Sequence, residues 1–63
     1  MPSIIIIGKG TINADDGMTI EKAMISAGEH PDAFIFLLGG RPIPMTSVLN
    51  EMKIEALRVA SGG

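Results

Sequence analysis

The stretch Ser3-Ile4-Ile5-Ile6-Ile7 contains four β-branched residues in a row. Such an unbroken apolar run predicts a strand that is covered on both faces and therefore lies inside its sheet. Gly8-Lys9-Gly10, which follows, is typical of a turn, and residues 11–13 can return as a short antiparallel strand. The start of the chain is therefore predicted to form a hairpin.

The hydrophobic period changes from Thr19 onward. Apolar residues now recur at i, i+3, i+4 and i+7, on one stripe of a helix: Ile20, Ala23, Met24 and Ala27. Thr19 suits the N-cap position, and Gly28 suits the left-handed position that follows the end of a helix. We expect a helix from about residue 19 to residue 27.

The second half of the chain predicts further strands. Residues 34–38, FIFLL, form a second apolar run of interior-strand length, and Gly39-Gly40 permits a tight turn. Residues 41–44, RPIP, carry prolines at alternate positions, which a sheet tolerates only at its edge. Thr46 or Ser47 can cap a single helical turn through residue 49, and residues 53–59 read as the last strand.

These elements predict an α+β domain of order ββαββ, with a short turn before the final strand and one helix packed on one face of a mixed sheet. If the first and last strands form the central pair, they must run parallel, because the chain between them is long enough to act as a crossover. This is the β-grasp pattern. We expect one domain over residues 1–59, followed by a C-terminal tail over residues 60–63.

Composition excludes several classes of function. In 63 residues one small core must hold the fold, so a deep active-site cleft would compete with it, and we expect no enzyme. Five Lys and Arg against seven Asp and Glu, with two Phe as the only aromatic residues, argue against nucleic-acid binding. No cysteine is present, and the longest apolar run is too short to cross a bilayer. We therefore expect a monomeric cytoplasmic protein that binds neither membrane nor metal.

No group of side chains has the spacing of a catalytic site. His30 precedes a proline in a predicted loop, and the carboxylates do not form an acid and base pair around one bond. Gly8-Lys9-Gly10 lacks the rest of a phosphate-binding loop. We expect no catalytic residues and no bound cofactor.

The end of the chain carries the group most open to chemistry. Ala60, Ser61, Gly62 and Gly63 follow the last strand, and four extended residues span about 13 Å, enough to place Gly63 in a partner's active site. Glycines can thread a channel that is too narrow for other residues. The α-carboxylate is ionised at pH 7 and is a poor acceptor for a nucleophile, so a partner enzyme must activate it with ATP. The alternative interpretation is a frayed end.

The last strand also predicts a docking surface. Alternation puts Ile54 and Ala56 on one face and Glu55, Leu57 and Val59 on the other. The charge of Glu55 indicates that the second face is exposed, which makes Leu57 and Val59, flanked by Arg58 and Arg41, a candidate partner-binding patch. The alternative is that the helix buries Leu57 and Val59 as core.

Three motifs resemble a known family. Asp16-Gly17, Gly40-Arg41-Pro42-Ile43-Pro44 and the closing residues 57–63, LRVASGG, are together similar to the small archaeal modifier proteins, within the wider ThiS/MoaD sulfur-carrier group of ubiquitin-like proteins. The likeness covers residues 15–63. The family often has an Asp-Gly-Asp-like turn before the last strand, where this chain has Asn50-Glu51-Met52.

The resemblance implies a β-grasp carrier whose C-terminal glycine, here Gly63 with Gly62 as its neighbour, is adenylated by an enzyme of the ubiquitin-activating type. The activated end then becomes a thiocarboxylate that donates sulfur for tRNA thiolation, thiamin or molybdopterin synthesis, or an isopeptide bond to a lysine of a target protein. We expect sulfur carriage first and conjugation as the alternative. A β-grasp interaction module with an inert terminus is the expectation from a different class.

Overall fold

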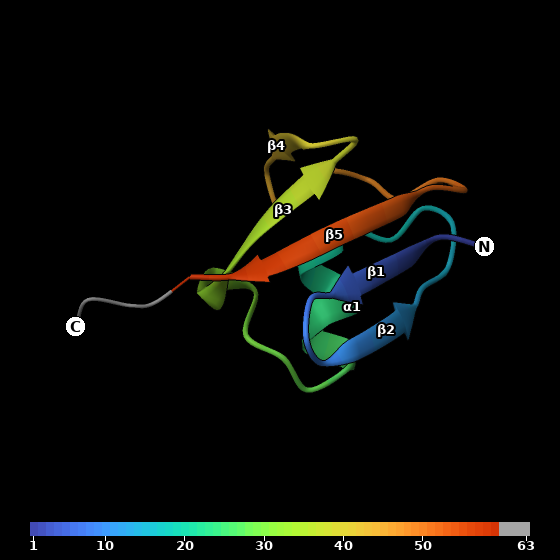
Figure 1. Ribbon diagram of the computed structural model, residues 1–63. Coiled ribbons are helices and arrows are strands. Elements are labelled where there is room, and N and C mark those ends of the chain that lie inside the picture. The colour runs from blue at the N-terminus through green and yellow to red at the C-terminus, as the bar shows by residue number, and fades with distance from the viewer. Residues whose placement is uncertain (60–63) are drawn as a thin grey trace.

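The computed structural model describes residues 1–59, which form a small α+β domain (Figure 1). The elements in chain order are β1 (Ser3–Ile6), β2 (Gly10–Asn13), α1 (Ile20–Ser26), the 3-10 helix η1 (Pro31–Ala33), β3 (Phe34–Leu38), β4 (Arg41–Ile43) and β5 (Lys53–Arg58). One α-helix and a five-strand mixed sheet within these residues are compatible with a β-grasp fold.

The sheet has the order β2-β1-β5-β3-β4. β1 and β5 are neighbours and run parallel, as the sequence predicted for the first and last strands, with Ile4 opposite Ile54 and Ile6 opposite Ala56. All other pairs are antiparallel. The strand and α-helix order is ββαβββ, one strand more than the predicted order ββαββ, which left out the edge strand expected over residues 41–44.

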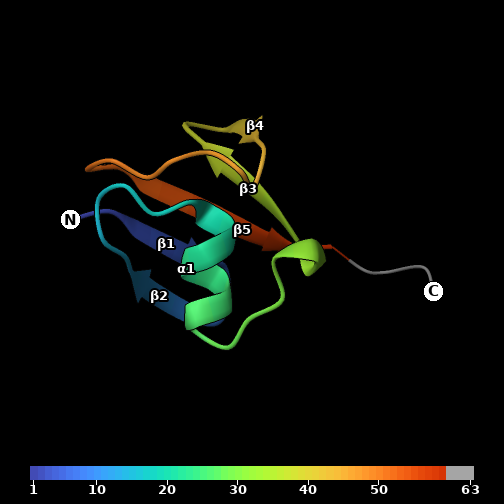
Figure 2. The ribbon, with the colours of Figure 1, turned by 180° about the vertical axis from the view of Figure 1, so that it is seen from behind.

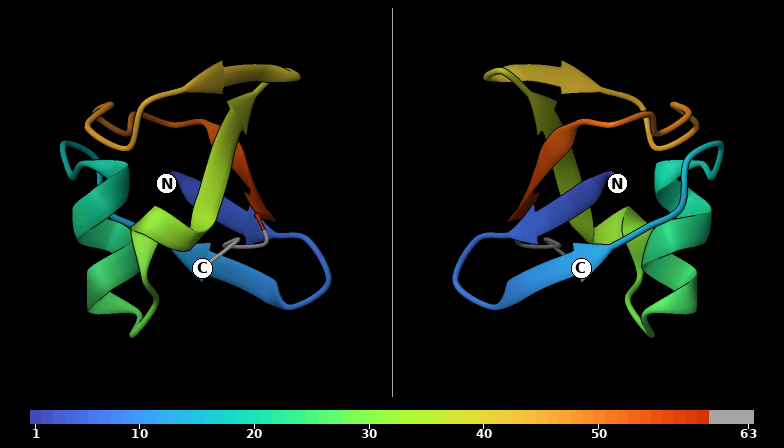
Figure 3. Two further views of the ribbon diagram at one scale, coloured as in Figure 1. Left: turned by 90° about the vertical axis from the view of Figure 1, so that its left-hand side faces the viewer. Right: turned by 90° about the vertical axis from the view of Figure 1, so that its right-hand side faces the viewer.

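The two apolar runs form interior strands, but only one face of each is covered. In β1, Ile4 and Ile6 are buried and Ile5 is half-buried, while in β3 Phe36 is buried and Ile35 is exposed. The expectation of cover on both faces is therefore wrong. The reason is that α1 packs on one side of the sheet only, as the views from either end show (Figure 3).

Helix α1 begins where the sequence predicted. The Thr19 hydroxyl oxygen accepts a hydrogen bond from the Lys22 backbone N–H at 3.2 Å, and Thr19 itself has extended dihedral angles. Gly28 has a φ of +81°, the left-handed conformation expected after the helix end. The helix is shorter than predicted and ends at Ser26, so Ala27 is its C-cap and is exposed.

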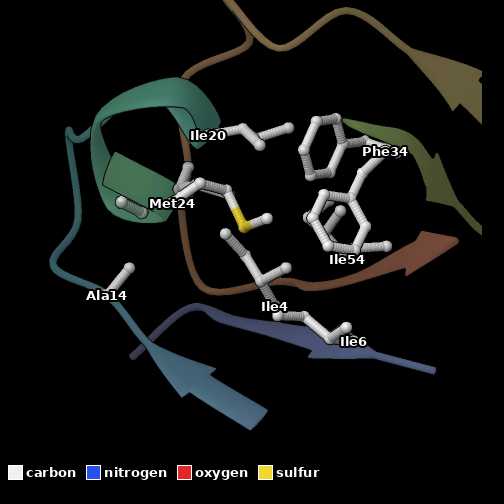
Figure 4. Close-up of a cluster of buried hydrophobic side chains, with 11 residues drawn as sticks. Ile4, Ile6, Ala14, Ile20, Met24, Phe34 and Ile54 are labelled. Atoms are coloured by element: carbon white, nitrogen blue, oxygen red, sulfur yellow. The ribbon is translucent and has the colours of Figure 1, made fainter. Parts of the chain in front are cut away.

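The core lies between α1 and the sheet (Figures 2 and 4). Met24 of the helix points toward Ile4 of β1 and Ile54 of β5, and Phe34 of β3 lies at the side of the core away from α1 (Figure 4). Ile4, Met24 and Ile54 have no exposed surface. Burial of each such side chain contributes about 1.5–3 kcal/mol relative to an exposed position, which makes this cluster the main stabilising feature of the fold.

The predicted helical turn over residues 46–49 is not formed. Met45 and Thr46 instead form a turn, in which Ser47 N–H donates to the Pro44 carbonyl at 3.0 Å. From Val48 the chain pairs with the segment that leads into α1: Leu49 N–H donates to the Met18 carbonyl at 2.7 Å and Gly17 N–H to the Leu49 carbonyl at 2.8 Å. Leu49 is fully buried. Pairing with this segment and insertion of Leu49 into the core replace the hydrogen bonds of a helical turn.

Candidate functional site

The face of the sheet opposite α1 has no helix packed on it within residues 1–59, and Figure 1 looks onto it. We call it the open face. Because side chains alternate along a strand, the residues between the buried ones point to this face. In β5 these are Lys53, Glu55 and Leu57, since Ile54 and Ala56 are fully buried.

Three exposed aliphatic residues lie side by side on the open face. Leu57 pairs directly with Ile35 of β3. On the side of Leu57 away from β3, β1 runs parallel to β5 and pairs Ile5 with Glu55. This register continues one residue past β1, because Ile7 N–H donates to the Ala56 carbonyl at 3.1 Å. Ile7 therefore lies beside Leu57. The exposed fractions are 51% for Ile7, 46% for Leu57 and 42% for Ile35. We call these three residues the apolar row.

The apolar row crosses the sheet at the end of β5. Leu57 is the penultimate residue of β5, and Val59 N–H donates to the Ala33 carbonyl at 2.9 Å, which holds the chain to the domain one residue beyond the strand. Val59 is half-buried rather than exposed. The predicted attachment residue Gly63 and the tail residues Gly62, Ser61 and Ala60 lie outside the described residues.

Arg58 lies close to Leu57 in sequence but on the other face. It pairs with Phe34, on the helix side of the sheet. At this end of the sheet a surface hollow of about 340 Å³ is lined by Arg58, Phe34, Ile6 and Lys9 and also by Ile7 of the apolar row. Lys9 also makes an ion pair with Glu29. The end of the sheet that precedes the tail therefore has an apolar row on one face and two cations on the other.

Arg41 is not part of this arrangement. Arg41 pairs with Leu38 at the end of β3. The residue before Leu38, Leu37, pairs with Glu55 of β5. Arg41 therefore lies on the edge strand, two strands from β5 and toward the beginning of β5. Leu57 is exposed, as predicted, but Val59 is half-buried, Arg58 lies on the opposite face, and Arg41 lies two strands away from β5.

Sequence reasoning missed Ile7 and Ile35 as members of the site. Both belong to apolar runs that looked like strands covered on both faces, so neither residue stood out as exposed. The signal that could have found them is the presence of a single predicted helix, because one short helix covers only one face of a sheet. The apolar residues that alternate with the buried ones must then be exposed.

Metal ligands and membrane-spanning helices are two further features that bear on function in the described part of the chain. No three His, Asp or Glu side chains within it come together as metal ligands. His30 is exposed and precedes η1. Among residues 1–59, no helix has the length and apolar character needed to cross a membrane.

No model of a known protein family matches the chain, and no curated protein matches it closely enough to count as similar.

Proposed function

We propose that this protein is a cytoplasmic ubiquitin-like β-grasp carrier that is activated at Gly63 by an adenylating enzyme and then carries sulfur as a thiocarboxylate. The observation that carries the proposal is the apolar row, which lies at the end of β5, immediately before the residues that lead to the C-terminus. A carrier needs a surface for its enzyme next to its reactive end, so that docking and delivery of the carboxylate occur together.

The chemistry of such a carrier belongs to the enzyme. An oxygen of the Gly63 carboxylate attacks the α-phosphorus of ATP, and pyrophosphate leaves, which gives an acyl adenylate. Sulfide, supplied by a sulfur donor, then attacks the acyl carbon and displaces AMP, which gives the thiocarboxylate. The carrier contributes a backbone end and a docking surface and uses none of its side chains in bond making or breaking.

The apolar row is suited to the docking step. Exposed aliphatic side chains that form a contiguous group are the usual centre of a protein interface, and charged residues form its rim. Lys53 and Glu55 lie on the same face, toward the beginning of β5, and are suited to such a rim. Arg58 and Lys9 on the other face are suited to contact acidic groups of the enzyme around the root of the tail.

The direct experiment is to incubate the protein with the activating enzyme of its host, ATP and sulfide, and to measure the mass of the intact protein. An exchange of oxygen for sulfur at the C-terminus supports the carrier. A variant that lacks Gly62 and Gly63 is the matched control and must show no change.

The same experiment separates the alternatives. When proteins from the host replace sulfide, the ε-amine of a lysine displaces AMP, and an isopeptide bond to a target supports a protein modifier. The absence of adenylate, thiocarboxylate and conjugate with an enzyme that is active on its own carrier supports an interaction module with an inert terminus.

A further inference from the structure

Glu55 lies next to the apolar row on the open face. It precedes Leu57 by two residues in β5, so both side chains point to this face. In the neighbouring strands Glu55 pairs directly with Ile5 of β1 and with Leu37 of β3. Both partners are half-buried aliphatic residues, whereas Glu55 is exposed. Glu55 is therefore a charged residue with apolar neighbours on three sides.

The side chains level with Glu55 extend the apolar surface across the sheet. Leu37 pairs in turn with Pro42 of β4, which is exposed on the same face. A protein interface takes about 20–30 residues from each side, so a partner that covers the three residues of the apolar row also covers the residues next to them. Glu55 then lies at the inner side of the charged rim, where the partner excludes water.

A carboxylate that is covered without a partner is unfavourable, because it loses the water that solvates it. Within residues 1–59 the only ion pair joins Lys9 and Glu29, so Glu55 is not neutralised by this part of the chain. Lys53 lies on the same face, but two residues away, about 7 Å along the strand, and it pairs with the polar residue Ser3. The cation for Glu55 must therefore come from the covering surface.

We propose that the activating enzyme presents a basic side chain to Glu55, beside aliphatic side chains that contact the apolar row. Arginine suits such a place well, because its planar guanidinium group can donate two hydrogen bonds to one carboxylate. This inference rests on the proposed function and adds the chemistry of the partner to it.

Glu55 is then the specificity-determining residue of the docking surface. The apolar row alone discriminates little, since any exposed aliphatic surface can contact it. A partner that has such a surface but lacks the cation must cover an unpaired carboxylate, and a partner with an acidic residue at this place is repelled. The apolar row thus supplies affinity, and Glu55 selects among partners.

The test is titration calorimetry of the full chain and its variants with the purified activating enzyme of the host. Glu55→Gln keeps the size and shape of the side chain and is expected to weaken binding at least about 30-fold, because it leaves the cation of the enzyme unpaired. Glu55→Lys is expected to bind more weakly still, because it places two cations opposite each other.

Glu21 provides the matched control. It is an exposed glutamate of α1, on the opposite side of the molecule from the open face. Glu21→Gln makes the same chemical change and is expected to leave the affinity unchanged. Circular dichroism of all variants checks that the fold is intact. Equal losses for Glu21→Gln and Glu55→Gln would overturn the proposal, because they would show an effect of net charge alone.

Lys53→Gln tests whether the chain neutralises Glu55 itself. With a cation from the enzyme, the loss for Lys53→Gln is expected to stay below about 3-fold, as for an exposed charge at a rim. A loss as large as that of Glu55→Gln would assign the cation to Lys53 and overturn the proposal.

The direction of the change is decisive. If the enzyme has no cation at this place, Glu55→Gln removes an unpaired charge from the contact and tightens binding. Tighter or unchanged binding of Glu55→Gln therefore overturns the proposal. A single Arg→Glu or Lys→Glu substitution in the enzyme that restores the binding of Glu55→Lys supports it.

The mass of the intact protein separates this inference from the proposed function. The natural chain is incubated with the enzyme, ATP and sulfide. Formation of the thiocarboxylate, together with an unchanged affinity of Glu55→Gln, overturns the role of Glu55 and leaves the carrier function standing. A natural chain that neither binds the enzyme nor gains sulfur overturns both.

Discussion

Leu57 is the residue on which the proposed docking surface most depends, because it lies between Ile7 and Ile35 in the apolar row. Leu57→Glu is expected to weaken binding of the activating enzyme at least about tenfold, the effect typical of a central interface residue. Titration calorimetry with the enzyme measures it.

Ile25 provides the control for Leu57. It is exposed to 59%, more than Leu57, but lies on α1, on the opposite side of the molecule from the open face. Ile25→Glu removes the same kind of exposed aliphatic group and is expected to leave the affinity unchanged. Equal losses in both variants would contradict a role specific to the apolar row.

Ile54 and Ile35 make the corresponding comparison for stability. Ile54 is fully buried in β5, whereas Ile35 is exposed on β3. Ile54→Val is expected to lower the free energy of unfolding by about 0.5–1.5 kcal/mol, and Ile35→Val is expected to change it by less than about 0.5 kcal/mol. Urea denaturation followed by circular dichroism measures both values. A larger loss of unfolding free energy for Ile35→Val than for Ile54→Val would contradict the assignment of Ile35 to the exposed face and of Ile54 to the core.

Residue-level reasoning predicted part of the site. Alternation along residues 53–59 was enough to separate Ile54 and Ala56 from Leu57, because a charged residue marks one face of that strand. The same reasoning did not find Ile7 and Ile35, since an uninterrupted apolar run has no polar residue to mark its exposed face. The position of Arg41 relative to Leu57 depends on strand order, which no local pattern contains.

At the level of the elements, α1 depends on its N-cap. The helix has seven residues, a length that is not stable alone in water, so packing and capping must stabilise it. Thr19→Ala removes the acceptor for the Lys22 N–H and is expected to lower the free energy of unfolding by about 1 kcal/mol. Thr19→Ser keeps the acceptor and is expected to restore most of that loss, which thermal denaturation of both variants measures.

Elements with a strong period were predictable, and elements that depend on distant partners were not. The helix from Ile20 and the interior strands follow from local hydrophobic spacing. The segment around Leu49 has good capping residues for a helical turn, yet pairing with Met18 and burial of Leu49 outweigh that local preference. The 3-10 helix η1 begins at Pro31, in a segment that the sequence predicted only as a loop.

At the scale of the whole molecule, a truncation tests whether the proposed activation is independent of the fold. Residues 1–59 contain the buried core and the five-strand sheet. A variant that lacks Gly62 and Gly63 is therefore expected to keep the midpoint of thermal unfolding within about 2 °C, a shift that corresponds to less than about 0.5 kcal/mol in a domain of this size. The same variant is expected to form no adduct with the activating enzyme and ATP. Full adduct formation by this variant would contradict activation at Gly63.

The position of β5 between β1 and β3 has a consequence for synthesis of the chain on the ribosome. β5 is the middle strand of the sheet, and it is the last of the five strands to leave the exit tunnel. Its pairing with β1 also joins the two ends of the domain, which makes this contact highly non-local in sequence. A nascent chain that stops before residue 53 lacks Ile54 and Ala56 and cannot complete the core. Folding of the domain therefore waits for β5, and a product that terminates before this strand is expected to stay open to proteolysis.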